Sequence, residues 1–221
     1  MGNNKKFQIA MVLALLAFCI PSQTGAVDIT RSGFLYSHFA GGRAGAWVMT
    51  TDEDAIDEIE DFSSSSLYAE FFYAHRISPL LSAELSIGIF SQGDLQFITN
   101  DILVDAIKIY PILISGKMYP LSGVSGLSMH PYLRAGGGLV YGTRDISTAY
   151  YYDLANDYIE ETQTRFTWLA GVGIDWPVSQ QIGLNLDFKY VPVDFGDALG
   201  GLEDYSGWEL TVGVGYIFKS K

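Results

Sequence analysis

The chain has 221 residues and a formal net charge of −12, because 25 Asp and Glu residues outnumber 13 Lys and Arg residues. Its only cysteine, Cys19, lies in an N-terminal apolar run, so the chain after this run has no thiol and forms no disulfide. Beyond that run, no apolar stretch approaches the roughly 18 residues of a membrane-spanning helix.

The N-terminus has the pattern of a secretory signal peptide. Lys5 and Lys6 precede an unbroken apolar run at residues 9–20, which Pro21 ends, and the small residues at 24–26 offer a cleavage site. An apolar run of twelve residues is too short to cross a bilayer, which argues against a helical anchor.

This pattern divides the chain into a cleaved signal peptide, residues 1–26, and one remaining domain, residues 27–221. No linker or low-complexity stretch interrupts the second part, and its length suits a single domain. A lipid-attachment site at Cys19 is the alternative, but Phe18 is bulky where such sites need a small residue.

Eight later segments alternate apolar and polar residues, which is typical of β-strands with two different faces. The last is the clearest: every second residue of 208–218 is apolar, from Trp208 to Phe218, over about the length that a tilted strand needs to cross a bilayer. Pro111 lies within the fourth segment, and because proline removes a ladder donor we expect a bulge or kink there. The predicted strands are residues 39–48, 66–76, 82–90, 105–119, 131–144, 165–176, 182–191 and 208–218.

We therefore predict an all-β fold for residues 27–221, an eight-stranded antiparallel up-and-down β-barrel that spans a bacterial outer membrane. Trp and Tyr lie mainly near the strand ends, as in the aromatic girdles of such barrels. The 24 glycines and the 14% aromatic content also suit a barrel. A large periplasmic β-sandwich would show the same alternation and stays open as an alternative.

The connections between these strands alternate in length. Residues 78–81 and 177–181 are tight turns, and residues 122–129 carry no charge. Three long connections carry 16 of the 25 acidic residues and no Lys or Arg: residues 50–62, 145–162 and 193–206. Bacterial barrels have short periplasmic turns and longer outer loops, so we expect the acidic segments outside and both termini in the periplasm.

The first acidic connection contains candidate ligands for weak Ca²⁺ or Mg²⁺ binding, namely Asp52, Glu53, Asp54 and Asp57. It lacks the central glycine of an EF-hand loop, so a solvated loop without a cation is the other interpretation. The expected partners are outer-membrane lipid, lipopolysaccharide and divalent cations. We expect no nucleic-acid partner, no cofactor and a monomer.

The polar faces of the strands carry charges of both signs, in nearly equal numbers although the whole chain is acidic. An unpaired charge in a confined interior costs several kcal/mol, so we expect these side chains to pair and to plug the barrel lumen. The predicted ion-pair network consists of Arg43, Glu70, Arg76, Glu84, Lys117, Arg134, Arg165, Asp175, Asp187, Lys189 and Glu209.

Several stretches resemble the small eight-stranded outer-membrane β-barrel proteins, near the OmpW and OmpA/OmpX types. They are Tyr110-Pro111-Ile112-Leu113, Lys117-Met118-Tyr119-Pro120, residues 131–138, residues 168–176 with the strand after them, and residues 212–218. The resemblance covers most of residues 105–218. It implies the barrel fold, and similarity to the OmpW type implies a narrow channel for small solutes, apolar ones included.

The remaining motifs give little support for chemistry. The histidines His38, His75 and His130 lie on different segments without helical spacing, so we expect no metal-ligand cluster. Ser128 and His130 invite comparison with barrel enzymes that modify lipid A, but they fall in a predicted periplasmic turn and the wider motif is missing.

The sequence thus favours a non-enzymatic barrel with acidic outer loops and a structural or surface-binding role. Eight strands leave an interior only wide enough for side chains, which favours this interpretation over a channel. The narrow channel stays the main alternative, and a lipid A-modifying enzyme is the minor one.

Overall fold

The computed structural model describes residues 37–51, 64–92, 95–98, 101–124, 126–150 and 157–218. The predicted signal peptide, residues 1–26, lies outside them. No helix in the described part is long and apolar enough to cross a membrane. The strands are β1 (His38–Met49), β2 (Ser65–Arg76), β3 (Leu81–Gln92), β4 (Leu95–Ile98), β5 (Asp101–Met118), β6 (His130–Tyr150), β7 (Asp157–Pro177), β8 (Ile182–Val191), β9 (Asp194–Leu199), β10 (Leu202–Asp204) and β11 (Gly207–Phe218).

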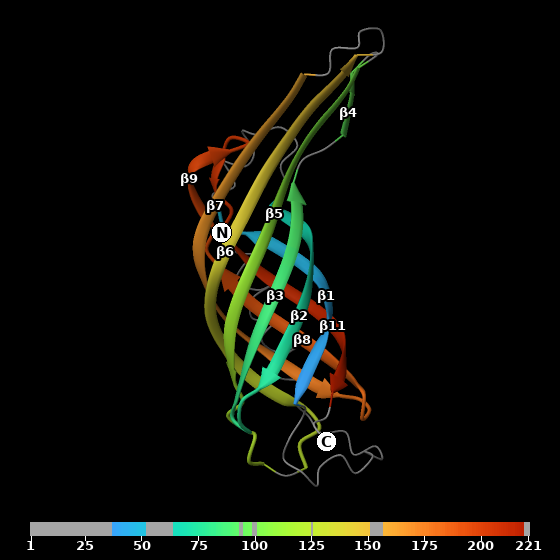
Figure 1. Ribbon diagram of the computed structural model, residues 1–221, viewed down its shortest axis with the longest axis vertical. Coiled ribbons are helices and arrows are strands. Elements are labelled where there is room, and N and C mark those ends of the chain that lie inside the picture. Colours follow the sequence, from blue (N-terminus) through green and yellow to red (C-terminus); the bar gives the residue numbers. More distant parts are fainter. Residues whose placement is uncertain are drawn as a thin grey trace, which may run out of the picture.

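Eight of these strands form a closed antiparallel barrel (Figure 1). Their order around the wall is β3-β2-β1-β11-β8-β7-β6-β5, and pairing of β3 with β5 closes the ring. The short strand β4 extends β5, while β9 and β10 form a separate two-stranded sheet. The predicted all-β, eight-stranded up-and-down barrel is confirmed, and the β-sandwich alternative is wrong.

The period-two pattern separates an apolar outer wall from a polar interior. On β11, Val212 and Val214 are 62% and 55% exposed, whereas Glu209 and Thr211 between the apolar positions are fully buried. The same alternation runs along β2, where Phe71 is exposed and its neighbours point inward. An outer surface of Leu, Ile, Val and aromatic side chains suits lipid.

Antiparallel pairing places the connections at two distinct ends. The short-turn end holds the connections after β2, β5 and β7, and the long-loop end holds those after β1, β3, β6 and β8. The three acidic connections therefore share one end of the barrel, as the sequence predicts.

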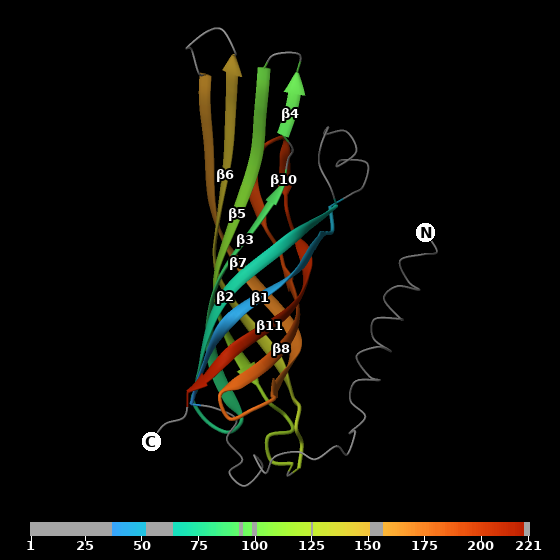
Figure 2. The ribbon, with the colours of Figure 1, turned by 90° about the vertical axis from the view of Figure 1, so that its right-hand side faces the viewer.

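Strands β5, β6 and β7 run far beyond the rest of the barrel at the long-loop end (Figure 2). The predicted loop 145–162 is therefore largely a β-hairpin, in which Ile146 pairs with Ile159. The acidic residues indicate a loop, but the β-branched and aromatic residues between the acidic ones, such as Ile146, Thr148 and Tyr150, favour a strand.

The strand register shows no bulge at Pro111. Pro111 faces Val140 of β6 in an unshifted register, and β5 keeps one register with β3 on both sides of it. On the β3 side the ladder lacks only the pairs at Gly88 and Ile89. The missing N–H of proline is thus accommodated by a local gap in the pairing with β3.

Candidate functional site: a filled barrel interior

Charged side chains of both signs fill the middle of the barrel. Arg43 on β1 lies at their centre: its Nη1 donates to Oε1 of Glu70 and its Nη2 donates to Oε2 of Glu84, each at 2.6 Å. Nη1 also lies 3.5 Å from Oδ2 of Asp187. One planar guanidinium thus joins β1 to β2, β3 and β8, a geometry for which arginine is better suited than lysine.

Arg134 on β6 completes this cluster from the opposite wall. It pairs with Asp187 through Nη1, and its Nη2 lies 3.1 Å from Oε1 of Glu84 and donates to Oγ of Ser115 at 2.9 Å. Lys117 on β5 is a third cation beside Glu84, with 2.6 Å between Nζ and Oε2. Glu84 is therefore the carboxylate shared by three cations.

The ion pairs continue around the wall. Nζ of Lys189 on β8 lies 2.9 Å from Oε2 of Glu70 and 2.9 Å from Oε1 of Glu209 on β11. Nζ of Lys117 lies 3.8 Å from Oδ1 of Asp175 on β7. Every one of the eight barrel strands therefore contributes to what we call the charged layer. Its members are Arg43, Glu70, Glu84, Lys117, Arg134, Asp175, Asp187, Lys189 and Glu209.

The charged layer is shielded from water. Each of its side chains is 0% exposed, except that of Asp175 at 2%. A water-filled channel would expose the side chains that line it. The middle of the interior is thus filled by paired side chains, whose mutual attraction offsets the cost of burying them.

Tyrosines support the charged layer on the side of the short-turn end. Tyr119 donates its hydroxyl hydrogen to Oδ2 of Asp175 at 2.6 Å, and Nδ2 of Asn185 lies 2.5 Å from Oδ1 of the same carboxylate. The ring of Tyr132 lies 4.2 Å from Nζ of Lys117, within the range of a cation–π contact. These contacts join side chains of β5, β6, β7 and β8.

The long-loop half of the interior contains an apolar cluster, which is covered by residues 192–206, here called the cap. The cap carries β9 and β10, and it buries Val193, Phe195, Leu199, Leu202 and Tyr205 among barrel side chains. The barrel members of this apolar cluster are Trp47, Met49, Tyr68, Phe90, Ile107, Ile109, Leu113, Val140, Leu169 and Val191.

Hydrogen bonds and a tight turn hold the cap in this position. Nε1 of Trp47 donates to the carbonyl oxygen of Tyr205 at 3.2 Å, and the Tyr205 hydroxyl donates to the carbonyl oxygen of Leu199 at 2.5 Å. Gly200 and Gly201, between β9 and β10, have φ values of 63° and 91°. Two consecutive left-handed residues make the tight hairpin turn that returns the chain over the barrel.

The cap is a more ordered structure than the long acidic connection expected at residues 193–206. Asp194, Asp197 and Glu203 are exposed, but the apolar residues between them face inward. A signal was present in the sequence, since Val193, Phe195 and the turn residues between Leu199 and Leu202 form a short apolar hairpin pattern. The number of acidic residues in this segment drew attention away from this apolar pattern.

Two further members of the predicted network lie toward the two ends of the barrel. Arg76, near the short-turn end, donates from Nε to the carbonyl oxygen of Ser78 at 2.9 Å and lies 3.9 Å from the centre of the Tyr119 ring. The side chain of Arg165 is 44% exposed, and its Nη2 lies 3.9 Å from Oδ2 of Asp197 in the cap. Because β7 pairs with β8 only from Ala170 onward, Arg165 lies beyond the closed interior.

The histidines differ from the expected isolated positions. His38 and His75 face each other across β1 and β2, with 3.2 Å between their Nδ1 atoms. His130 begins β6 at the short-turn end. In the described part of the chain, no three His, Cys, Asp or Glu side chains form a metal-binding group. Asp52, Glu53, Asp54 and Asp57 lie outside that part, so cation binding by them stays a prediction.

The comparisons with known proteins agree with this architecture. A family model, the outer membrane protein beta-barrel domain, matches residues 10–218. The chain belongs to this family. It is a β-barrel protein of the bacterial outer membrane, as the sequence predicts. No curated protein sequence matches the chain at a significant level.

Solved structures share the fold at low sequence identity. Ail, the attachment invasion locus protein of Yersinia pestis, in complex with the heparin analogue sucrose octasulfate, matches with a TM-score of 0.53 at 12% identity over 82% of this chain and 97% of Ail. Neisserial surface protein A matches with a TM-score of 0.52 at 16% identity, over 82% of this chain and 96% of the neisserial protein. A major outer membrane protein of Thermus thermophilus matches with a TM-score of 0.51 at 12% identity, over 82% of this chain and 98% of the Thermus protein.

Proposed function

We propose that this protein is a closed, non-enzymatic outer-membrane barrel that acts through its outer surface, in a structural or surface-binding role. The observation that carries this proposal is the filled interior. The charged layer is inaccessible to water, and the cap buries a second, apolar layer above it. A solute would have to displace both layers to pass.

The long-loop end supplies the surface for this role. The paired strands β5, β6 and β7 project beyond the other barrel strands (Figure 2), and the cap presents Asp194, Asp197 and Glu203 to solvent. An exposed surface of this charge favours a cationic partner or one joined through cations, and it disfavours polyanions. In this proposal the long-loop end faces the cell exterior.

The enzyme alternative has little support in the geometry. Ser128 and His130 lie at the short-turn end, which faces the periplasm in this orientation. A catalytic group that acts on lipid A would have to reach the outer leaflet, at the opposite end of the barrel.

Planar-bilayer conductance tests the closed interior. The refolded wild-type protein should give no reproducible current steps, while a porin measured in the same membrane provides the positive control. Regular steps from the wild type would contradict the proposal and would favour the narrow channel.

A further inference from the structure

A histidine pair lies on the outer wall of the barrel at the short-turn end. His38 is the first residue of β1, and its cross-strand partner His75 is the last residue but one of β2. Their rings are stacked, with 4.8 Å between centroids and 28° between planes. Tyr73, two residues before His75 on the same face, lies with its hydroxyl oxygen 2.7 Å from Nδ1 of His38.

Three lone-pair donors meet at this point. Nδ1 of His38 faces Nδ1 of His75 at 3.2 Å and the Tyr73 oxygen at 2.7 Å. A neutral imidazole nitrogen without a proton has one lone pair, so it cannot accept a full hydrogen bond from both neighbours at once. A cation bound to the two nitrogens would use both lone pairs together.

The spacing of the nitrogens fits a transition-metal ion. Metal–nitrogen bonds of about 2.0–2.1 Å bring two nitrogens to about 2.9 Å from each other at the right angle of a tetragonal Cu²⁺ site, and to about 3.3 Å at a tetrahedral angle. The observed separation of the Nδ1 atoms is 3.2 Å. Imidazole suits Zn²⁺, Ni²⁺ and Cu²⁺, and of these Cu²⁺ generally binds a given site most tightly.

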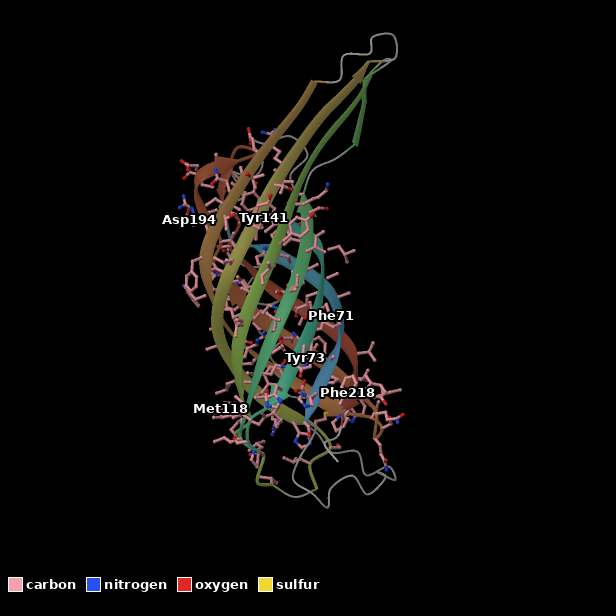
Figure 3. The ribbon with its side chains drawn as sticks, viewed as in Figure 1. Phe71, Tyr73, Met118, Tyr141, Asp194 and Phe218 are labelled. Carbon is pink, nitrogen blue, oxygen red and sulfur yellow. The ribbon has the colours of Figure 1, made fainter. Side chains whose placement is uncertain are left out.

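The site is reachable from the aqueous boundary of the membrane. His38 pairs with Phe218 of β11, and the exposed rings of Tyr216 and Phe218 lie beside it in the manner of an interface girdle. Figure 3 shows Tyr73 and Phe218 on the part of the wall that approaches the short-turn end. His75 is exposed at the end of its strand, so an ion can reach it without entering the hydrocarbon layer.

We propose that His38 and His75, with the hydroxyl of Tyr73 beside them, bind one divalent transition-metal ion, preferably Cu²⁺. The site is distinct from the filled interior, because its side chains lie on the outer face of the same strands. Its sources of affinity are two nitrogen ligands that the β1–β2 ladder holds in place and an adjacent oxygen donor.

The test is titration of the refolded full-length barrel, without a polyhistidine tag, in detergent micelles with Cu²⁺. The wild type should bind one equivalent, and the electron paramagnetic resonance spectrum should show coupling to two nitrogens. His38→Ala and His75→Ala should each weaken binding at least tenfold, and the spectrum of each variant should lose one nitrogen.

His130→Ala is the matched control, since His130 begins β6 on the opposite side of the strand ring from β1, and this variant should bind Cu²⁺ as the wild type does. Tyr73→Phe should weaken binding less than loss of either histidine. Electrophoretic heat-modifiability checks that every variant is folded. Binding that persists unchanged in both His38→Ala and His75→Ala, or no binding by the folded wild type, would overturn the proposal.

Discussion

The two layers of the barrel interior are filled by different physical means. The charged layer joins all eight strands through ion pairs, whereas the layer near the long-loop end is an apolar cluster completed by the cap. Charged groups need partners at defined positions, and apolar groups need only be removed from water. The charged layer therefore depends more strongly than the apolar layer on the correct register of the barrel strands.

This difference shows how one strand pattern can specify both layers. A shift of one residue in any barrel strand would turn its charged residue toward lipid and leave the partners unpaired. An apolar side chain in the cap could adapt to a small displacement at lower cost. We infer that the charged layer fixes the register of the barrel and that the cap adds burial once the barrel has closed.

The largest effect should follow from removing the carboxylate that three cations share. Glu84→Gln keeps the side-chain shape but leaves Arg43, Lys117 and Arg134 with one fewer anionic partner. We expect the free energy of unfolding to fall by about 3–5 kcal/mol, measured by chemical denaturation of the barrel in micelles. Glu203→Gln, at an exposed position of the cap, is the control and should change it little. Equal stability of the two variants would refute the importance of the charged layer.

A smaller loss should follow from weakening the cap. Leu199 is fully buried, so Leu199→Ala should lower the free energy of unfolding by about 2–4 kcal/mol and speed hydrogen exchange of the cap amides. Leu121→Ala, where the side chain is 44% exposed, serves as the matched control. Fast hydrogen exchange of the cap amides in the wild type would contradict the packing of the cap against the barrel.

The smallest effect concerns the boundary between the two layers. A Cβ atom added at Gly88 would lie 2.6 Å from Cζ of Tyr68, whose hydroxyl donates to Oε2 of Glu70 at 3.0 Å. Gly88→Ala should therefore cost about 1–3 kcal/mol in the same denaturation assay. At Gly123 an added Cβ meets nothing within 4 Å, so Gly123→Ala should be neutral. Matching values for the two variants would contradict this packing.

The sequence was sufficient to predict the eight strands and the direction of their faces, because period-two alternation is a local property. Nine of the eleven charged residues expected on the inward faces lie in the charged layer. Arg165 lies outside the charged layer because β7 extends beyond the end of β8, and the local sequence of β7 does not show where its pairing with β8 ends. The pairing of His38 with His75 depends on cross-strand register, which is a property of the assembled sheet.

The extended hairpin and the cap were missed for a different reason. The acidic residues in 145–162 and 193–206 indicate long outer connections, yet alternate residues in these stretches favour strands or apolar burial. Average charge describes which residues face solvent, but the backbone conformation depends on the residues between them.

The most direct test of the charged layer is a double-mutant cycle on Arg134 and Asp187, which pair across the barrel between β6 and β8. Arg134→Gln, Asp187→Asn and the double variant would be unfolded by denaturant in micelles. If the pair holds the interior together, the two losses should be non-additive, with a coupling energy of about 1–3 kcal/mol. Losses that add to within about 0.5 kcal/mol would show that the two groups act independently, and would contradict a barrel closed by its ion pairs.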